Sequence, residues 1–251
     1  MFCYVLVAVL SASFAVLFFP RQSSLYSRSK STQGPPTRLL SSQELSSYDG
    51  EEGSKGIYLA ILGQVYDVHN GLKHYGPGGA YHFVAGKDAS LAFVTGDFTE
   101  SGLTDDVSAL SPLQAVALFD WLLFYQRTYQ PVGLVIGRFY SESGKPTEFL
   151  LQMESLLAKG QQLKAKTQAE MLHFPACNSE WSSARGGRVW CSTESGGVER
   201  SWAGVPRKLF SLRDSGSRCV CVEDPSAAKA NPNLQEYDGC STQAVTCSLV
   251  E

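Results

Sequence analysis

The distribution of cysteines is the feature of this sequence that most constrains its fold. Six of the seven cysteines lie between positions 177 and 247, whereas the 173 residues between Cys3 and Cys177 contain none. An even number of cysteines in a short, loop-rich stretch predicts a disulfide framework rather than a zinc site, because histidine partners other than His173 are missing. Spacing alone does not choose among the possible pairings. The candidates for three structural disulfides are Cys177, Cys191, Cys219, Cys221, Cys240 and Cys247.

Length and charge bound the architecture. A chain of 251 residues with 43% apolar side chains can bury a core in one or two domains, which excludes a wholly disordered protein. Its net charge of −3 argues against nucleic acid as a partner, because phosphate recognition needs a clustered cationic surface. Residues 41–140 carry 5 basic and 11 acidic side chains, and residues 141–251 carry 12 and 13. This shift predicts two units that meet near position 140.

The N-terminus indicates entry into a membrane. Residues 2–19 contain no charged side chain, a run that is long for the core of a signal peptide and short for a membrane span. We interpret residues 1–22 as a signal peptide or signal anchor and residues 23–38, rich in serine, proline and arginine, as a linker.

Two features of the chain disagree about its compartment. Arg21, Arg28 and Lys30 follow the apolar run, and by the positive-inside rule they favour an anchored protein with its bulk in the cytosol. The clustered cysteines favour an oxidising compartment and carry more weight. The sequence therefore predicts a secreted protein, with a membrane-anchored protein of the secretory pathway as the alternative. Membrane association follows only if the N-terminal segment, with Cys3, is retained.

Caps and turns predict an α+β fold. Ser41 and Glu44 fit a capping box at the start of a short helix. Apolar runs over 57–62 and 65–68, joined by Gly63-Gln64, predict a hairpin with a type II′ turn. We also expect a helix that is capped by Ser111 and ends near Tyr129, a strand over 132–136, a helix over 147–172 that Gly160 weakens, and disulfide-held loops beyond Phe174.

The densest motif is Lys73-His74-Tyr75-Gly76-Pro77-Gly78-Gly79-Ala80-Tyr81-His82. Its glycines and proline make a sharp turn that lets the backbone approach a flat ligand closely. Together with Tyr66-Asp67-Val68, Ala85-Gly86-Lys87-Asp88-Ala89-Ser90 and Tyr129-Gln130-Pro131-Val132-Gly133, this turn resembles the membrane-associated progesterone receptor family, which has a cytochrome b5-like fold. The resemblance implies a haem-binding domain over 39–140, a helical connector over 141–174 and a Cys-rich, disulfide-stabilised region over 175–251.

The residues differ from those of ordinary cytochrome b5, which is similar but holds haem iron between two histidines. The first of these histidines immediately precedes Pro-Gly-Gly, where this chain has Gly76. No histidine lies between Phe83 and Leu172, where the second ligand would have to be. The bis-histidine electron carrier is therefore disfavoured.

The resemblance implies that a tyrosine holds the haem iron instead. Tyr81 matches the axial ligand of the family, Tyr75 and Tyr129 match further tyrosines of the pocket, and Gly78 and Gly79 belong to the turn beside the cofactor. A phenolate can ligate haem iron, and Fe(III) favours it by displacing the phenolic proton. The implied cofactor is non-covalent b-type haem in the ferric state.

Three other positions bear on the surroundings of the implied haem. Thr128 stands where a relative has a lysine near the haem, which puts haem-mediated pairing of subunits in doubt. Val84 and Phe93 are equally well explained as walls of the haem pocket or as plain core.

Simpler interpretations compete at several residues. Any of the tyrosines could serve only for packing. The spacing of His69, His74 and His82 fits no common zinc pattern, so we expect surface histidines. Asp105-Asp106 is expected to form a solvated turn.

The sequence thus predicts a secreted, non-enzymatic haem-binding protein. No nucleophile elbow, phosphate loop or persuasive Cys/His constellation indicates catalysis. The resemblance, which extends to a secreted member of the family, also implies a role in promoting neuronal differentiation through an unidentified protein receptor. Two alternatives stay open: a haem-independent module that binds a protein or a steroid-like ligand, and an electron carrier.

Overall fold

The computed structural model describes residues 38–210, 216–228 and 231–249. The predicted signal or anchor, Cys3 and all of the predicted linker except Arg38 lie outside the described residues. Among the helices of the described ranges, none combines the length and the apolar character needed to cross a membrane.

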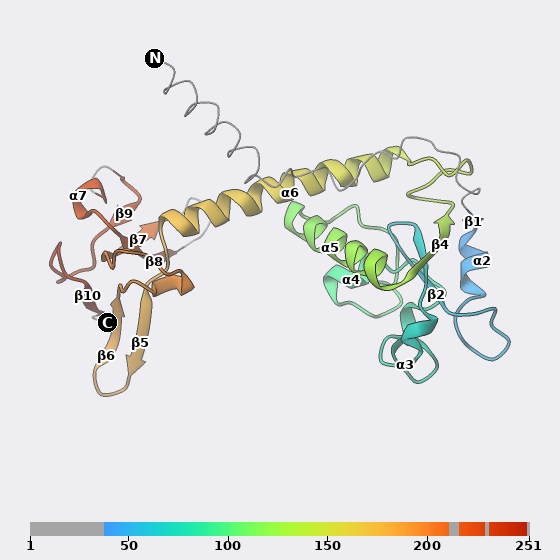
Figure 1. Ribbon diagram of the computed structural model, residues 1–251, viewed down its shortest axis with the longest axis horizontal. Coiled ribbons are helices and arrows are strands. Elements are labelled where there is room, and N and C mark those ends of the chain that lie inside the picture. The colour runs from blue at the N-terminus through green and yellow to red at the C-terminus, as the bar shows by residue number, and fades with distance from the viewer. Residues whose placement is uncertain (1–37, 211–215, 229–230, 250–251) are drawn as a thin grey trace, which may run out of the picture. The chain divides into compact units, whose positions relative to one another are not determined.

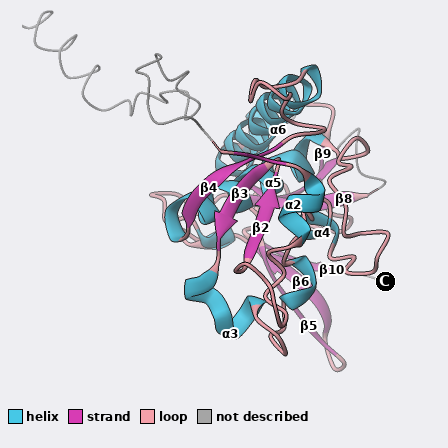
Figure 2. Ribbon diagram, turned by 90° about the vertical axis from the view of Figure 1, so that its right-hand side faces the viewer, coloured by secondary structure: helices cyan, strands magenta, loops and turns pink. Residues whose placement is uncertain are grey.

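The first half of the described chain is built on a four-stranded sheet with the order β1-β4-β3-β2. β1 (Leu39–Leu40) pairs parallel to β4 (Gln130–Val135), and β3 (Gln64–Asp67) pairs antiparallel to both β4 and β2 (Tyr58–Ile61). Figure 2 shows β4, β3 and β2 side by side. The helices of this half are α2 (Ser42–Ser46), α3 (Leu72–Tyr75), α4 (Ala92–Thr95), α5 (Pro112–Thr128) and the 3-10 turns η1 (His69–Gly71) and η2 (His82–Val84). This mixture confirms the α+β prediction.

The helix starts follow the predicted caps. The Ser41 hydroxyl accepts a hydrogen bond from the Glu44 amide at 3.0 Å. Ser111 and Gln114 form a reciprocal capping box, with proline at the first position of α5. Because these contacts span only three residues, the sequence predicted the start of α5 correctly.

The turn between β2 and β3 differs from the prediction. Its central residues are Leu62 and Gly63 rather than Gly63 and Gln64, and their φ angles of 49° and 74° fit a type I′ turn. Leucine disfavours this conformation, so its surroundings must hold it there. The Ser90 hydroxyl accepts from the Leu62 amide and the Asp88 carboxylate accepts from the Gly63 amide, each at 2.7 Å. The segment 85–90 therefore anchors this hairpin.

The predicted helix over 147–172 is continuous. α6 runs over Glu148–His173, and the Thr147 hydroxyl caps it. Its buried Leu150 and Met153 join the core of the four-stranded sheet and α5, and Figure 1 shows α6 alongside α5. Gly160 does not interrupt the helix: a side chain there would overlap the Pro112 carbonyl oxygen at the start of α5. The glycine permits the close approach of the two helices.

This approach predicts the effect of Gly160→Ala. In an exposed helix the change usually stabilises a protein by about 0.5–1 kcal/mol. Here the added methyl group overlaps Pro112, so we expect a loss of roughly 1–3 kcal/mol in the free energy of unfolding. Denaturant melts of the full chain check this, with Gln161→Ala on the exposed side of α6 as the control. A gain of stability in Gly160→Ala would show that the helices do not meet here.

The C-terminal region is more regular than the expected loops. One three-stranded sheet has the order β10-β6-β5 and a second has the order β8-β7-β9. The first contains β5 (Asn178–Ser182), β6 (Gly186–Trp190) and β10 (Thr246–Leu249). The second contains β7 (Val205–Phe210), β8 (Ser217–Val222) and β9 (Leu234–Gln235), with η3 (Ser195–Gly197) and α7 (Pro225–Ala228) nearby in sequence.

Three disulfides form among the six predicted cysteines, which confirms the framework. They join Cys177 to Cys219, Cys191 to Cys221 and Cys240 to Cys247. The second sheet has a small core of its own, in which Val205, Leu209, Val220 and Val222 are buried. Covalent links therefore supplement a core that is small for a region of this length.

Candidate functional site

A cavity of about 370 Å³ lies among α3, η2, α4 and α5. This volume falls in the usual range of ligand pockets, roughly 300–1,000 Å³. Aromatic side chains make up most of its lining, which suits a flat, apolar ligand. The lining residues are His74, Tyr75, Tyr81, Val84, Ala92, Phe93, Gly96, Phe98, Trp121, Phe124, Tyr125 and Tyr129.

The glycine-rich turn directs the chain from α3 to Tyr81. The Gly79 amide donates to the Gly76 carbonyl oxygen and the Tyr81 amide donates to the His74 carbonyl oxygen, each at 2.8 Å. Gly78 has a φ of +79°, and a side chain at Gly79 would overlap the His74 backbone. Gly78 and Gly79 do not line the cavity, so their place in the site is to shape the turn.

Tyr81 lies at the rim of the cavity. It is 49% exposed, and its ring lies 6.4 Å from that of Tyr75 and 6.2 Å from that of Phe83. Phe98, Trp121 and Phe124 on the same cavity are also exposed. A ligand here would therefore keep one edge open to solvent.

Three other tyrosines lie close together inside the cavity. The Tyr75 and Tyr125 hydroxyls lie 2.7 Å apart, and the Tyr129 ring lies 5.9 Å from that of Tyr75. Burial raises the pKa of Tyr125 to about 12, and burial together with the bond to Tyr125 raises that of Tyr75 further. Both phenols are therefore neutral donors at physiological pH. The bond between these two hydroxyls uses one of their two protons, so one O–H of the pair is left to donate elsewhere.

The lining of the cavity contains most of the site residues that the sequence suggested, together with three aromatic residues that it did not. Tyr75, Tyr81 and Tyr129 share the cavity, and Val84 and Phe93 also belong to its lining. Thr128 is exposed and lies outside the lining. Sequence reasoning missed Trp121, Phe124 and Tyr125. Their only signal was the aromatic spacing along α5, with Trp121 and Tyr125 on the same helical face as Tyr129.

The three histidines do not gather into a metal site. Within the described residues, the only close group of three metal-ligating side chains consists of cysteines. His69 and His74 are exposed, as expected. His82 is half-buried instead: its Nδ1 lies 2.8 Å from the Tyr75 carbonyl oxygen and its Nε2 lies 2.7 Å from Glu51 Oε1. The side chain of His82 thus ties the turn to the loop that carries Glu51.

This pair of contacts predicts a pH-dependent stability. The hydrogen bond to the Tyr75 carbonyl oxygen, with help from Glu51, raises the pKa of His82 above its ordinary value. The stabilisation is therefore fully present below about pH 6.5 and is lost as the pH rises through the folded-state pKa. We expect the difference in the free energy of unfolding between the native chain and His82→Gln to shrink as the pH rises from about 6.5 through the folded-state pKa of His82. Denaturant melts at several pH values measure it, with His69→Gln as the matched control, and a difference that grows with pH would contradict it.

The predicted solvated turn at Asp105-Asp106 is an ion-pair site. Asp105 lies 3.0 Å and Asp106 lies 3.5 Å from nitrogens of Arg138, which follows β4. These partly exposed pairs connect the segment before α5 to the end of the sheet, and pairs of this kind contribute little to stability.

A family model that matches this chain agrees with this fold. Residues 41–138 match the family model described as "Cytochrome b5-like Heme/Steroid binding domain". Neuferricin from Danio rerio is 58% identical over 218 residues, which cover 86% of this chain and 81% of the relative. Neuferricin from Homo sapiens is 49% identical over 84% of this chain and 86% of the relative. A solved Arabidopsis thaliana protein described as having a cytochrome b5 like fold is 33% identical, with a TM-score of 0.39, over 43% of this chain and 99% of its own.

Proposed function

Because the chain belongs to the neuferricin family and carries a cytochrome b5-like haem/steroid-binding domain, we propose that it binds haem with Tyr81 as the protein ligand to the iron. The observation that carries this proposal is the position of Tyr81 on an aromatic cavity, beside a turn that lacks the histidine of ordinary cytochrome b5.

Burial disfavours Tyr75 and Tyr125 as ligands to the iron. A ligating phenol must lose its proton, and the raised pKa values of Tyr75 and Tyr125 oppose this loss. Their hydroxyls are also engaged with each other. Tyr81 is on the rim and half-exposed. Tyr75, Tyr125 and Tyr129 are suited instead to donate a hydrogen bond to an oxygen inside the cavity.

The cavity fits haem in shape and chemistry. Aromatic rings from α4 and α5 form its walls, with Phe93 5.8 Å from Trp121 and 5.6 Å from Tyr125. The exposed rim leaves room for the charged edge of a haem to stay in water. Bound haem would supply a ferric iron, which phenolate ligation favours over ferrous iron. The protein is then a haem carrier or sensor rather than an enzyme.

Replacing the proposed ligand gives the first test. Tyr81→Phe removes one half-exposed hydroxyl, so folding should be nearly unchanged. We expect hemin affinity to fall at least about tenfold, or about 1.4 kcal/mol, with loss of the high-spin ferric spectrum. Titration of the purified full chain with hemin measures both quantities. The matched control is Tyr58→Phe, which alters a half-buried tyrosine of β2 that stacks on Tyr48 away from the cavity.

The outcomes of this titration separate the candidate functions. Full affinity and an unchanged spectrum in Tyr81→Phe would refute the ligand assignment. A low-spin, six-coordinate spectrum of the native chain would favour the electron carrier. Absence of stoichiometric haem uptake by the native chain would leave a haem-independent module. In that case the spare O–H of the Tyr75–Tyr125 pair is suited to a carbonyl oxygen of a steroid-like ligand.

Tyr125 gives a second test within the same site. Its hydroxyl is bonded to that of Tyr75, whose ring lies 6.4 Å from the Tyr81 ring. We propose that this pair of O–H dipoles stabilises negative charge on the Tyr81 oxygen. Removing this support in Tyr125→Phe makes the phenolate a stronger donor to ferric iron. We expect haem to bind still and the Fe(III)/Fe(II) potential to fall by roughly 40 mV, which corresponds to about 1 kcal/mol. Spectroelectrochemistry measures the shift, and an unchanged or higher potential would contradict the coupling.

The remaining parts of the proposal concern biology. We propose that the protein is secreted and promotes neuronal differentiation through a protein receptor. The three disulfides support an oxidising compartment. Alkylation of freshly isolated protein tests the compartment, since six freely reactive thiols would contradict secretion. Application of the purified protein to neural precursor cells tests the activity, with Tyr81→Phe to show whether it needs haem.

A further inference from the structure

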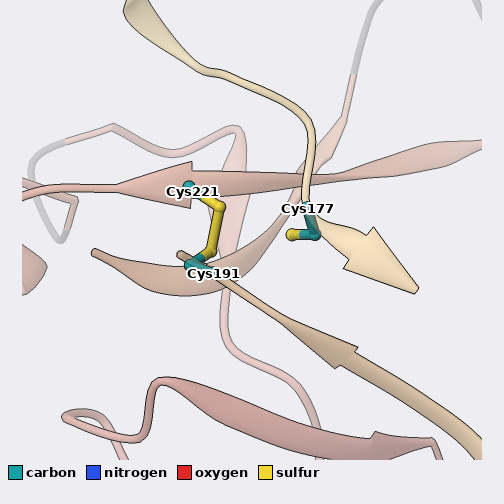
Figure 3. Close-up of side chains that lie close together, drawn as sticks. All are labelled: Cys177, Cys191 and Cys221. Carbon is teal, nitrogen blue, oxygen red and sulfur yellow. A yellow bond between two sulfur atoms is a disulfide. The ribbon is translucent and has the colours of Figure 1, made fainter. Parts of the chain in front are cut away.

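Two of the three disulfides lie side by side in the C-terminal region. The Sγ atoms of Cys177, Cys191 and Cys221 all lie within 4.8 Å of one another. Figure 3 shows the Cys177 side chain directed toward the Cys191–Cys221 disulfide. The sulfur of Cys219, to which Cys177 is bonded, is not a member of this close group. A thiolate formed at Cys177 would therefore be next to a second disulfide.

Both disulfides connect the same two sheets. Cys177 immediately precedes β5 and Cys191 immediately follows β6, and these strands pair in one sheet. Cys219 and Cys221 are two positions apart on β8 of the other sheet. Both disulfides therefore connect the β5–β6 hairpin to strand β8.

The same backbone also suits a different pairing. The β5–β6 ladder ends at the pair of Asn178 and Trp190, and Cys177 and Cys191 are the next residues on the two sides of the hairpin. Their Sγ atoms already lie within 4.8 Å of each other, so forming the bond of about 2.05 Å requires a movement of less than about 3 Å. A Cys177–Cys191 bond would lie within one sheet and would connect nothing to β8.

We propose that these four cysteines form a thiol–disulfide exchange site at which one external dithiol opens both links between the sheets. The dithiol attacks the Cys177–Cys219 bond, whose two cysteines are half-buried, whereas Cys191 and Cys221 are buried. It leaves as a disulfide and gives two electrons and two protons to Cys177 and Cys219.

The second step is internal and transfers no electrons to or from the protein. The Cys177 thiolate attacks Sγ of Cys191, the Cys191–Cys221 bond breaks, and the departing Cys221 thiolate takes up a proton. The product has a Cys177–Cys191 disulfide and a Cys219/Cys221 dithiol on β8. One two-electron reduction thereby replaces two inter-sheet links with one link inside a sheet.

Two variants that remove the same disulfide test the exchange. Cys219→Ser leaves a thiol at Cys177, beside the second disulfide, and Cys177→Ser leaves it at Cys219. Each full-length variant is purified under oxidising conditions and held without denaturant near pH 8.5, close to the usual cysteine pKa. Acid then stops the exchange, and the denatured chain is labelled with N-ethylmaleimide and mapped by mass spectrometry. Over minutes to hours, most of the label should shift from Cys177 to Cys221 in Cys219→Ser and stay on Cys219 in Cys177→Ser.

Every other pattern would overturn the proposal. A label that remains on Cys177 would show that the second disulfide is not attacked, and a label on Cys191 would show a different product. Equal migration in both variants would show that the position of Cys177 does not matter. A label on Cys240 or Cys247 would place the exchange in unfolded chains, since these residues form the third disulfide and do not belong to the close group. Haem plays no part in this readout.

Discussion

The hydrogen bond from the Tyr81 amide to the His74 carbonyl oxygen is the contact on which the candidate site depends. It closes the Gly-Pro-Gly-Gly turn on the end of α3 and brings Tyr81 back to the cavity that α3 and α5 share. The turn can close because Gly78 adopts a positive φ and Gly79 has no side chain to meet His74. His82 then fastens the far side of the turn to the Tyr75 carbonyl oxygen and Glu51. Replacing Gly78 or Gly79 would therefore displace Tyr81 although Tyr81 itself is unchanged.

Burial gives chemically identical phenols different roles. Tyr75 and Tyr125 are enclosed and bonded to each other, so they are held as neutral donors. Tyr81 is close to them but half-exposed. If Tyr81 is the iron ligand, as we propose, the two buried phenols remain available as O–H donors inside the cavity. The cysteines of the close group also differ in exposure: Cys177 is half-buried, whereas Cys191 and Cys221 are buried.

Local contacts could be predicted from the sequence and distant ones could not. Ser41 and Ser111 cap their helices through residues three positions away, so their neighbours in sequence reveal them. The Leu62-Gly63 turn was misplaced because Ser90 and Asp88, more than twenty positions away, stabilise it. Gly160 was read as a weak point because its partner, Pro112, lies on another helix.

The candidate site shows the same division. Tyr81, Tyr75 and Tyr129 came from a motif resemblance, whereas Tyr125 belongs to no motif and is revealed only by its contact with Tyr75. The pairing of the cysteines likewise needed the strand arrangement, since Cys219 and Cys221 lie in β8 and bond to residues that flank β5 and β6.

Resonance Raman spectroscopy of the ferric haem complex of the full chain tests the central claim most directly. Excitation in the phenolate-to-iron charge-transfer band enhances the ring vibrations of a ligating tyrosine. If Tyr81 holds the iron, these bands will be present, will shift when the protein is made with ring-deuterated tyrosine, and will be absent from Tyr81→Phe. A haem complex without tyrosinate bands, or one that keeps them in Tyr81→Phe, would contradict the account.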